Sequence, residues 1–318
     1  MRNKILLLSV FLILFSCQKQ DKQEHYVPWK PENPTEKTIS IEESTKLLIV
    51  TEQKHQRILL IDVPTKKIAW SWNAAEDGVP LNRAGWFDLP DEAKRIGDNI
   101  LITASRGGVA LIRVSDKKLL FYTNTGGNPH SAEVLPDGNI VVASSTGGNI
   151  SVFKFNKQEP YVEAPAFKMK AKSAHNVVWD KKRECLWSAV WADLWKISYN
   201  SSKVSLTLED AYAMDPVNTE AHDLSPVYGQ DALYVTTNQK SYIFDVEKKT
   251  FEPMGAFIEG TIKSVSEGPN GYPAIITRPT TSSYWTTEVV DFNRNRIYFN
   301  PSYMIYKARW YVEQPFCR

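Results

Sequence analysis

The chain has 318 residues, with 38 lysines and arginines against 36 aspartates and glutamates. A protein that binds nucleic acid needs an excess of basic residues to replace the counterions of the phosphates, so this near-neutral balance excludes that class. The length suffices for one large all-β domain or for two domains of ordinary size.

The N-terminus has the three features of an export signal for a lipoprotein. Arg2 and Lys4 precede an apolar run from Ile5 to Phe15, and Ser16 places a small residue directly before Cys17. The run is too short for a membrane-spanning helix, which needs about 20 apolar residues. Residues 1–17 are therefore predicted to be a signal peptide with a lipobox, and Cys17 to carry lipid such as palmitate. The alternative is an ordinary secretory signal in which Cys17 is incidental.

Residues 18–37 are polar and charged, with Pro28, Pro31 and Pro34 spaced along them. This composition is typical of an extended tether. The lysine and acidic residues soon after Cys17 resemble the start of Bacteroidota lipoproteins that are displayed on the cell surface. We therefore expect a lipid-anchored outer-membrane protein on the cell surface, with the periplasmic face as the alternative. The lipid would be its only contact with the membrane.

After residue 38 the pattern changes to short β-rich runs separated by turn residues. One apolar strand recurs six times, and successive copies begin between 40 and 53 residues apart, at residues 47, 100, 140, 186, 233 and 274. The longest spacing holds an insertion around Ala74 to Pro90. A second and a third strand follow each copy and a fourth precedes it, which amounts to four antiparallel strands in about 45 residues.

This repeat predicts an all-β fold, a six-bladed β-propeller of four-stranded blades formed by residues 38–318 as a single domain. A propeller must hide its open edge. The segment Tyr306 to Tyr311 resembles an inner strand, so we expect it to close the ring by pairing within the first blade. In the alternative, Thr38 to Glu42 supplies that strand.

A histidine stands at the start of the innermost strand in three consecutive units. We expect these residues and their counterparts in the other units to form a polar ring around the channel mouth: His130, His175, His222, Asp91, Lys263 and Lys307. Three interpretations are open. The histidines form hydrogen bonds between blades, or the ring binds an anionic or polyhydroxylated ligand, or the three imidazoles bind a divalent metal with Asp91 or Glu133 nearby.

Loops on the same face add candidate ligand-binding residues, because arginine binds carboxylate or sulfate and aromatic rings stack on sugars. These are Arg106, Trp191, Arg278 and Trp285, together with Arg309 of the closing strand. No nucleophile elbow or zinc-protease motif is present. The sequence therefore assigns no catalytic residue and no certain cofactor.

Two cysteines remain besides Cys17. Cys185 and Cys317 are expected in different parts of the fold, as unpaired and partly buried thiols, although an exported protein can form disulfides.

Three stretches carry a resemblance to a known group of proteins: Gly107 to Ile112, His130 to Ser144 and Tyr306 to Trp310. Through them the chain resembles uncharacterised six-bladed propeller lipoproteins of Bacteroidota that are associated with polysaccharide utilisation gene clusters. The resemblance implies a glycan-related role. The expected function is the binding of an acidic oligo- or polysaccharide. Two alternatives are a metal-dependent polysaccharide lyase or lactonase that uses the mouth histidines, and a scaffold for partner proteins of a glycan-uptake system.

Overall fold

The computed structural model of this chain describes residues 36–214, 220–255, 260–280 and 283–317. The predicted signal peptide, Cys17 and almost all of the tether lie outside the described residues. Within these ranges no helix is long and apolar enough to cross a membrane.

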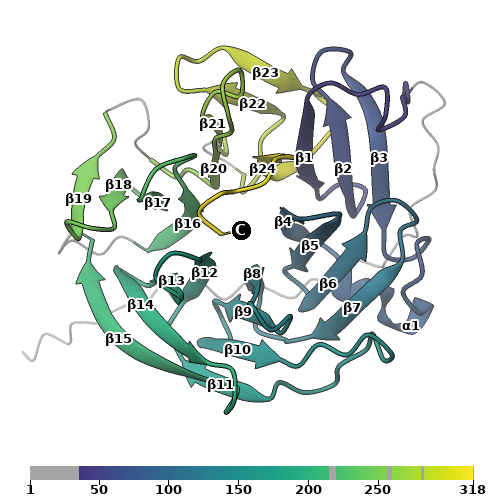
Figure 1. Cartoon of the computed structure of the whole chain (residues 1–318). Coiled ribbons are helices and arrows are strands. Elements are labelled where there is room, and N and C mark those ends of the chain that lie inside the picture. The colour runs from purple at the N-terminus through teal and green to yellow at the C-terminus, as the bar shows by residue number, and fades with distance from the viewer. Residues whose placement is uncertain (1–35, 215–219, 256–259, 281–282, 318) are drawn as a thin grey trace, which may run out of the picture.

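Six four-stranded antiparallel sheets are arranged around a central axis, as predicted (Figure 1). From the axis outward, blade 1 contains β24 (Ile305–Trp310), β1 (Leu47–Glu52), β2 (Arg57–Asp62) and β3 (Lys67–Asn73). Blade 2 contains β4 (Pro90–Ile96), β5 (Asn99–Ala104), β6 (Gly108–Arg113) and β7 (Leu119–Asn124). Blade 3 contains β8 (Pro129–Val134), β9 (Ile140–Ser144), β10 (Asn149–Phe153) and β11 (Phe167–Lys170).

The remaining blades repeat this order. Blade 4 contains β12 (Ala174–Asp180), β13 (Cys185–Val190), β14 (Asp193–Asn200) and β15 (Ser205–Ala213). Blade 5 contains β16 (Ala221–Pro226), β17 (Ala232–Thr237), β18 (Ser241–Asp245) and β19 (Thr250–Pro253). Blade 6 contains β20 (Ser264–Ser266), β21 (Ile275–Thr277), β22 (Glu288–Asp291) and β23 (Arg296–Phe299). The insertion before β4 forms the short helices α1 (Leu81–Ala84) and η1 (Gly85–Phe87).

The C-terminal strand closes the ring. β24 pairs antiparallel with β1, with Leu48 opposite Trp310 and Val50 opposite Ala308. The edge of blade 1 that would otherwise face the axis is thereby covered. The alternative prediction for Thr38 to Glu42 is wrong, because Thr38 forms a parallel bridge with Ile68 of β3, at the outer edge of the same blade.

The core lies between neighbouring blades, because successive side chains of a strand point to opposite faces of its sheet. In β1, Leu47 and Ile49 pack in the cluster that includes Ile100 of blade 2. Leu48 and Val50 pack in the cluster that includes Ile275 of blade 6. Both faces of an inner strand are therefore buried, which explains why these strands are apolar runs without alternation.

The innermost strands share a β-bulge at the same position. In β8, Pro129 lies opposite Ser144 and Ser131 lies opposite Ala143, so His130 is an extra residue in the ladder. The same irregularity isolates Asp91 in β4, His175 in β12 and His222 in β16. A bulge redirects the side chain of its extra residue, and bulges are frequent beside functional sites.

The two described cysteines contradict one expectation. Cys185 and Cys317 both lie buried in one cluster that joins blades 4 and 5, not in different parts of the fold. No disulfide joins the two thiols. Burial among apolar side chains, with Asp180 nearby, raises the pKa of Cys185 to about 12, so this thiol is unreactive at neutral pH.

Candidate functional site at the channel mouth

The bulge residues gather at one end of the central channel, together with Lys263 of blade 6. We call this set the mouth ring, which consists of Asp91, His130, His175, His222, Lys263 and Tyr306. Lys263 precedes β20, and its backbone N–H donates to the carbonyl of Thr277. The six residues of this ring come from six different blades, so only the complete propeller assembles it.

His130 has hydrogen-bonding partners at both ring nitrogens. The side-chain amide of Asn128 donates to Nε2 at 3.1 Å, and Nδ1 lies 3.3 Å from a carboxylate oxygen of Asp91. The hydroxyl of Ser105 also donates to that carboxylate, at 2.9 Å. Burial and the neighbouring His175 hold the pKa of His130 well below its usual value. The neutral imidazole therefore joins blade 3 to blade 2.

His175 differs because only one of its ring nitrogens has a hydrogen-bond partner among the described residues. Its Nδ1 donates to the backbone carbonyl of Ser173 at 2.9 Å, which leaves the lone pair on Nε2. Within the described part of the chain no group donates to that Nε2, although His175 is only 5% exposed. Burial lowers the pKa of His175 to about 4, and the charges of Lys307 and Lys263 act in the same direction. At neutral pH this nitrogen is thus an unprotonated acceptor.

His222 is fixed between an amide and a cation. Its Nε2 donates to the side-chain oxygen of Asn238 in a short hydrogen bond. The ammonium of Lys263 lies 3.4 Å from Nδ1, where it can donate. Burial lowers the pKa of His222 well below its usual value, and the charge of Lys263 adds to this effect.

The rings of the mouth are stacked. The centroids of His130 and His175 are 4.6 Å apart with planes 13° from parallel, whereas His175 and His222 meet edge to face at 5.5 Å. Tyr306 lies nearly parallel to His130 at 6.3 Å, and the Lys263 ammonium lies 5.6 Å from the Tyr306 ring. The mouth is therefore a nearly continuous aromatic surface with one cation.

The prediction that Lys307 belongs to the ring is wrong, because Tyr306 occupies that position. Between the pairs Val50–Ala308 and Glu52–Ile305, β24 contains one residue more than β1. This shift turns Lys307 toward the next level of the channel, where its ammonium contacts a carboxylate oxygen of Asp223 at 3.0 Å. Arg309 also lies below the ring and not at its mouth.

The level below the mouth is a buried ion layer of Glu92, Asp223, Lys307 and Arg309. The guanidinium of Arg309 donates two hydrogen bonds to the carboxylate oxygens of Asp223, at 2.8 and 2.6 Å, and a short one to Glu92. Burial alone would raise the pKa of both carboxyl groups. The charges of Lys307 and Arg309 outweigh this and hold both pKa values below their usual range. These four charged side chains come from three different blades and meet in the interior of the propeller.

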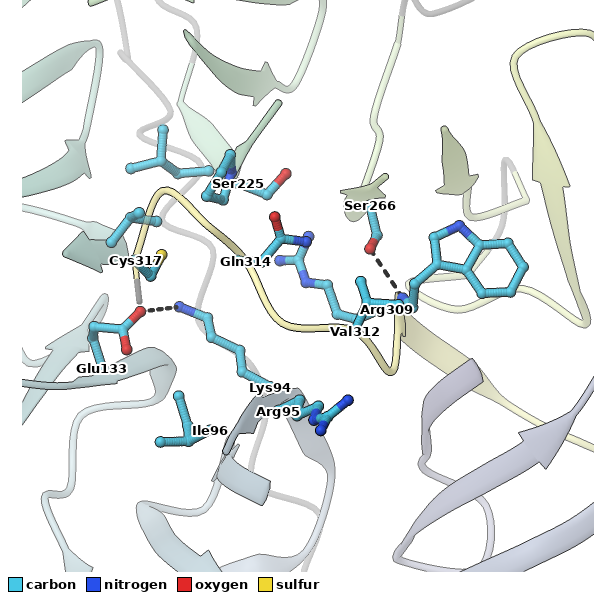
Figure 2. Close-up of a pocket in the computed structure, with 14 residues that line it drawn as sticks. Lys94, Arg95, Ile96, Glu133, Ser225, Ser266, Arg309, Val312, Gln314 and Cys317 are labelled. Atoms are coloured by element: carbon cyan, nitrogen blue, oxygen red, sulfur yellow. Dashed lines mark hydrogen bonds and ion pairs between the residues drawn. The ribbon is translucent and has the colours of Figure 1, made fainter. Parts of the chain in front are cut away.

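Below the ion layer lies a distal chamber at the opposite end of the channel (Figure 2). Its volume is about 60 Å³, and Lys94, Glu133, Arg309, Gln314 and Cys317 are among the residues that line it. Lys94 faces Glu133 across the chamber at 3.8 Å. The C-terminal segment crosses the axis here (Figure 1), and the amide of Gln314 donates to the carbonyl of Glu267. This space is too small for a sugar ring, since ligand pockets usually enclose about 300 Å³ or more.

A rim loop places one of the predicted aromatic residues, Trp191, near the mouth ring. The backbone of Trp191 accepts from the N–H of Ala221 and donates to Ser173, and Lys172 lies 3.9 Å above its indole ring. Trp285 is half-buried, and its carbonyl accepts from Ser283. Arg106 is exposed on the β5–β6 loop. Burial raises the pKa of Asp88 to about 6, although the charge of the nearby Arg106 acts in the opposite direction. Arg278 is not in the ring and lines a separate pocket on blade 6.

Sequence analysis missed several residues of this region. Tyr284 is 66% exposed and lies 6.0 Å from the Lys263 ammonium. Glu220 accepts a short hydrogen bond from the hydroxyl of Ser173, beside His175. Both residues lie in loops, where no strand periodicity marks a side chain as inward-facing.

The described residues contain no group of three histidine, cysteine, aspartate or glutamate side chains arranged to hold a metal ion. His130, His175 and His222 are neighbours, but two of the rings are stacked face to face and the third has a lysine at its Nδ1.

Comparison with known proteins identifies the family. Residues 3–318 match DUF6528, a family of unknown function. The chain belongs to this family. No curated protein sequence matches it.

Two solved structures illustrate how far the DUF6528 chain resembles other propellers. A protein of unknown function from Bacteroides caccae is 15% identical, with a TM-score of 0.57 over 85% of this chain and 100% of that one. A "putative 6-phosphogluconolactonase" from Bacteroides uniformis is 14% identical, with a TM-score of 0.55 over 86% of this chain and 87% of that one. At these identities the similarity shows the fold alone.

Proposed function

We propose that the mouth ring binds a polyhydroxylated ligand, an oligosaccharide, and that the protein is a glycan-binding propeller. The observation that carries this proposal is the Nε2 of His175, an acceptor to which none of the described residues donates, in a site lined by neutral imidazoles. A sugar hydroxyl supplies the missing proton donor. The exposed ring of Tyr284 offers a face on which a sugar can stack.

The charges of the mouth refine the expected ligand. Lys263 is a cation, whereas Asp91 and Glu220 are carboxylates, and burial keeps the three histidines neutral. These charges favour a hydroxyl-rich sugar with at most one acidic group near Lys263. They do not favour a densely anionic polysaccharide.

A metal-dependent lyase or lactonase remains a separate hypothesis. It needs a group of metal ligands, and the described residues do not provide a set of three. It predicts that chelators abolish turnover of an acidic polysaccharide. A protein-binding scaffold gains no specific support from the described surface.

The glycan proposal is tested with two replacements of His175. His175→Phe keeps a ring in the stack and removes the acceptor, whereas His175→Gln keeps an acceptor oxygen. We expect His175→Phe to weaken binding of the best ligand from an oligosaccharide array by roughly ten-fold, the value of about one hydrogen bond, and His175→Gln to weaken it less.

Lys182→Ala serves as the control, because Lys182 is exposed in the β12–β13 turn, at the end of blade 4 away from the mouth. Calorimetric titration gives the affinities, and thermal unfolding shows that each variant is folded. Equal affinity of the wild type and His175→Phe would remove His175 from the site.

We further propose that the propeller is lipid-anchored through Cys17 at the outer membrane and faces the cell surface, where it meets glycan and partner proteins of an uptake system. The support is the order of basic residues, apolar run and Cys17. The family match from residue 3 onward includes this segment.

A further inference from the structure

An aromatic cluster surrounds Arg83 outside the channel, where the insertion before β4 meets the outermost strand of blade 2. The guanidinium carbon of Arg83 is 3.7 Å from the centre of the Tyr161 ring. It is also 5.4 Å from the centre of the Trp86 ring and 5.7 Å from that of the Tyr122 ring. One of its amino groups donates to the Tyr122 hydroxyl at 2.8 Å. These four side chains, which we call the Arg83 cluster, come from three separate segments of the chain.

The backbone holds each segment of the Arg83 cluster in place. Tyr161 lies in the connection between β10 and β11, and its two flanking residues form hydrogen bonds with the backbone of Tyr122 at 2.7 and 3.0 Å. Trp86 belongs to η1, which approaches β6 so closely that a Cβ atom at Gly108 would be 2.6 Å from the Trp86 carbonyl oxygen. The rings and the guanidinium are therefore positioned before a ligand arrives, which lowers the entropy cost of binding.

The guanidinium of Arg83 keeps hydrogen-bonding capacity for a ligand. Among the described residues it donates to the Tyr122 hydroxyl, and no carboxylate of those residues pairs with it. Arginine stacks on aromatic rings through its flat face, and its five N–H groups lie in the guanidinium plane. Stacking on Tyr161 therefore leaves the other N–H groups able to donate to both oxygens of one carboxylate. Arg83 is half-buried, which strengthens its attraction to an anion.

The rings beside Arg83 add an apolar surface. Trp86 and Tyr161 are both half-buried, and their ring centres lie 6.2 Å apart with planes 34° from parallel. Aromatic rings of this kind bury apolar area at low entropy cost. A ligand that uses both features has a carboxylate next to a face of C–H groups. A uronic acid has this structure, because its carboxylate is attached to a pyranose ring whose C–H groups form an apolar face.

We propose that the Arg83 cluster binds a uronic acid unit of a glycan, with the carboxylate on Arg83 and the sugar ring against Trp86. Paired hydrogen bonds from arginine to a carboxylate are among the strongest in proteins. The cluster lies at the outermost strand of blade 2, whereas the mouth ring surrounds the axis, so it is a second contact for an extended glycan. The inference rests on the proposed function for the class of ligand only and uses no residue of the mouth ring.

The test compares oligomers of galacturonic, glucuronic and mannuronic acid with their methyl esters, which keep the sugar rings and lack the charge. Calorimetric titration of the full chain measures each affinity. We expect at least one acid to bind roughly ten-fold more tightly than its ester, as charge-assisted hydrogen bonds allow. Arg83→Met should remove this difference. Arg83→Lys should retain part of it, because lysine keeps the charge and loses the paired hydrogen bonds.

Arg296→Met is the matched control. The Arg296 guanidinium also lies over an aromatic ring, 4.5 Å from the centre of the Phe299 ring, but it already pairs with Glu288 at 2.8 Å. This variant should keep the wild-type ratio of acid to ester affinity. Thermal unfolding shows which variants are folded, and Arg83→Lys decides by the same ratio if Arg83→Met does not fold.

The ratio of acid to ester affinity also separates this site from the mouth ring. His175→Phe should change the binding of acid and ester alike and leave their ratio unchanged, so failure of the mouth proposal is distinguishable from failure at Arg83. The proposal is overturned if no acid binds more tightly than its ester. It is also overturned if a folded Arg83→Met variant keeps the wild-type ratio, which would assign the preference for acid to another cation such as Lys263.

Discussion

Each of the three mouth histidines has a different set of partners, although all three occupy the same position in their blades. Both nitrogens of His130 and of His222 have partners within the protein, which agrees with hydrogen bonding between blades. His175 has a partner at Nδ1, and no described group donates to its Nε2. The same residue type at the same position of the repeat thus has a different set of hydrogen bonds in each blade.

The buried histidines predict a loss of stability in mild acid. The pKa of His175 is about 4 in the folded protein and about 6.5 in the unfolded chain, so the unfolded chain binds more protons between these values. Stability from this residue is complete above about pH 6.5 and is lost as the pH falls toward 4. We expect about 2 kcal/mol of loss from His175 between pH 7 and pH 5.

Urea unfolding across this pH range measures the effect, with His175→Gln as the matched variant. The pKa values of Glu92 and Asp223 are also lowered, but these carboxyl groups contribute mainly below pH 4.5. The variant should therefore show a shallower slope between pH 6.5 and pH 5. Parallel curves would mean that His175 is not held neutral by the fold.

Asp223 is expected to be the most sensitive residue of the ion layer. It is fully buried and accepts from Lys307, from Arg309 and from the backbone of Val265. Asp223→Asn keeps the shape but leaves two cations with only Glu92, so we expect a loss of about 3–5 kcal/mol in the free energy of unfolding. Asp245→Asn, at a surface carboxylate paired with Lys248, should cost much less, because solvent screens such a pair. Similar losses in both variants would contradict this account.

Sequence analysis located five ring positions by a repeated pattern but could not reveal the ion layer. Glu92, Asp223 and Arg309 are charged residues within strands, and such residues are normally exposed. Only their meeting from different blades makes burial possible. The sequence also could not show that Tyr306, and not Lys307, lies in the mouth ring. The bulge that causes this adds one residue to β24 and is seen only in the pairing of strands.

At the scale of elements, the strand pattern predicted six blades and the closing strand correctly. Strands buried on both faces form apolar runs between turns, and six such runs are sufficient to count blades. The partner of the segment at Thr38 was not predictable in the same way. A single bridge to Ile68 leaves no periodic signal.

Closure by β24 predicts that the end of the chain is needed for folding. A chain that ends after Met304 loses the inner strand of blade 1, including the buried Trp310, and leaves the Glu92 and Asp223 carboxylates without Lys307 and Arg309. We expect no cooperative thermal transition. A chain that ends after Glu313 retains β24 and loses chiefly the burial of Phe316, about 2 kcal/mol. Circular dichroism on heating distinguishes them, and a cooperative transition in the shorter chain would refute the closing role.

At the scale of the whole molecule, the ion layer divides the channel into two unequal parts. The mouth ring lies on one side, and the distal chamber beneath the C-terminal segment lies on the other. Four buried charged side chains lie between the mouth ring and the chamber. The candidate site at the mouth is therefore a feature of one face of the disc.

The proposed anchor predicts where this face operates. Cys17→Ser should move the protein from the membrane fraction to the soluble fraction and abolish labelling with a palmitate analogue, while the propeller keeps its melting temperature. Added protease should degrade the wild type on intact cells if the protein faces outward. Membrane association that survives Cys17→Ser would show that the cysteine is not the anchor.

The shared bulge has a consequence for how such a site can change. In four blades one additional residue turns its side chain to the mouth, and the backbone around it is the same whether that residue is an aspartate or a histidine. The backbone of the bulge therefore accommodates either residue type. Under the proposed function, exchanging residues at these few positions would alter the recognised ligand without rebuilding a loop, while the disc itself stays constant.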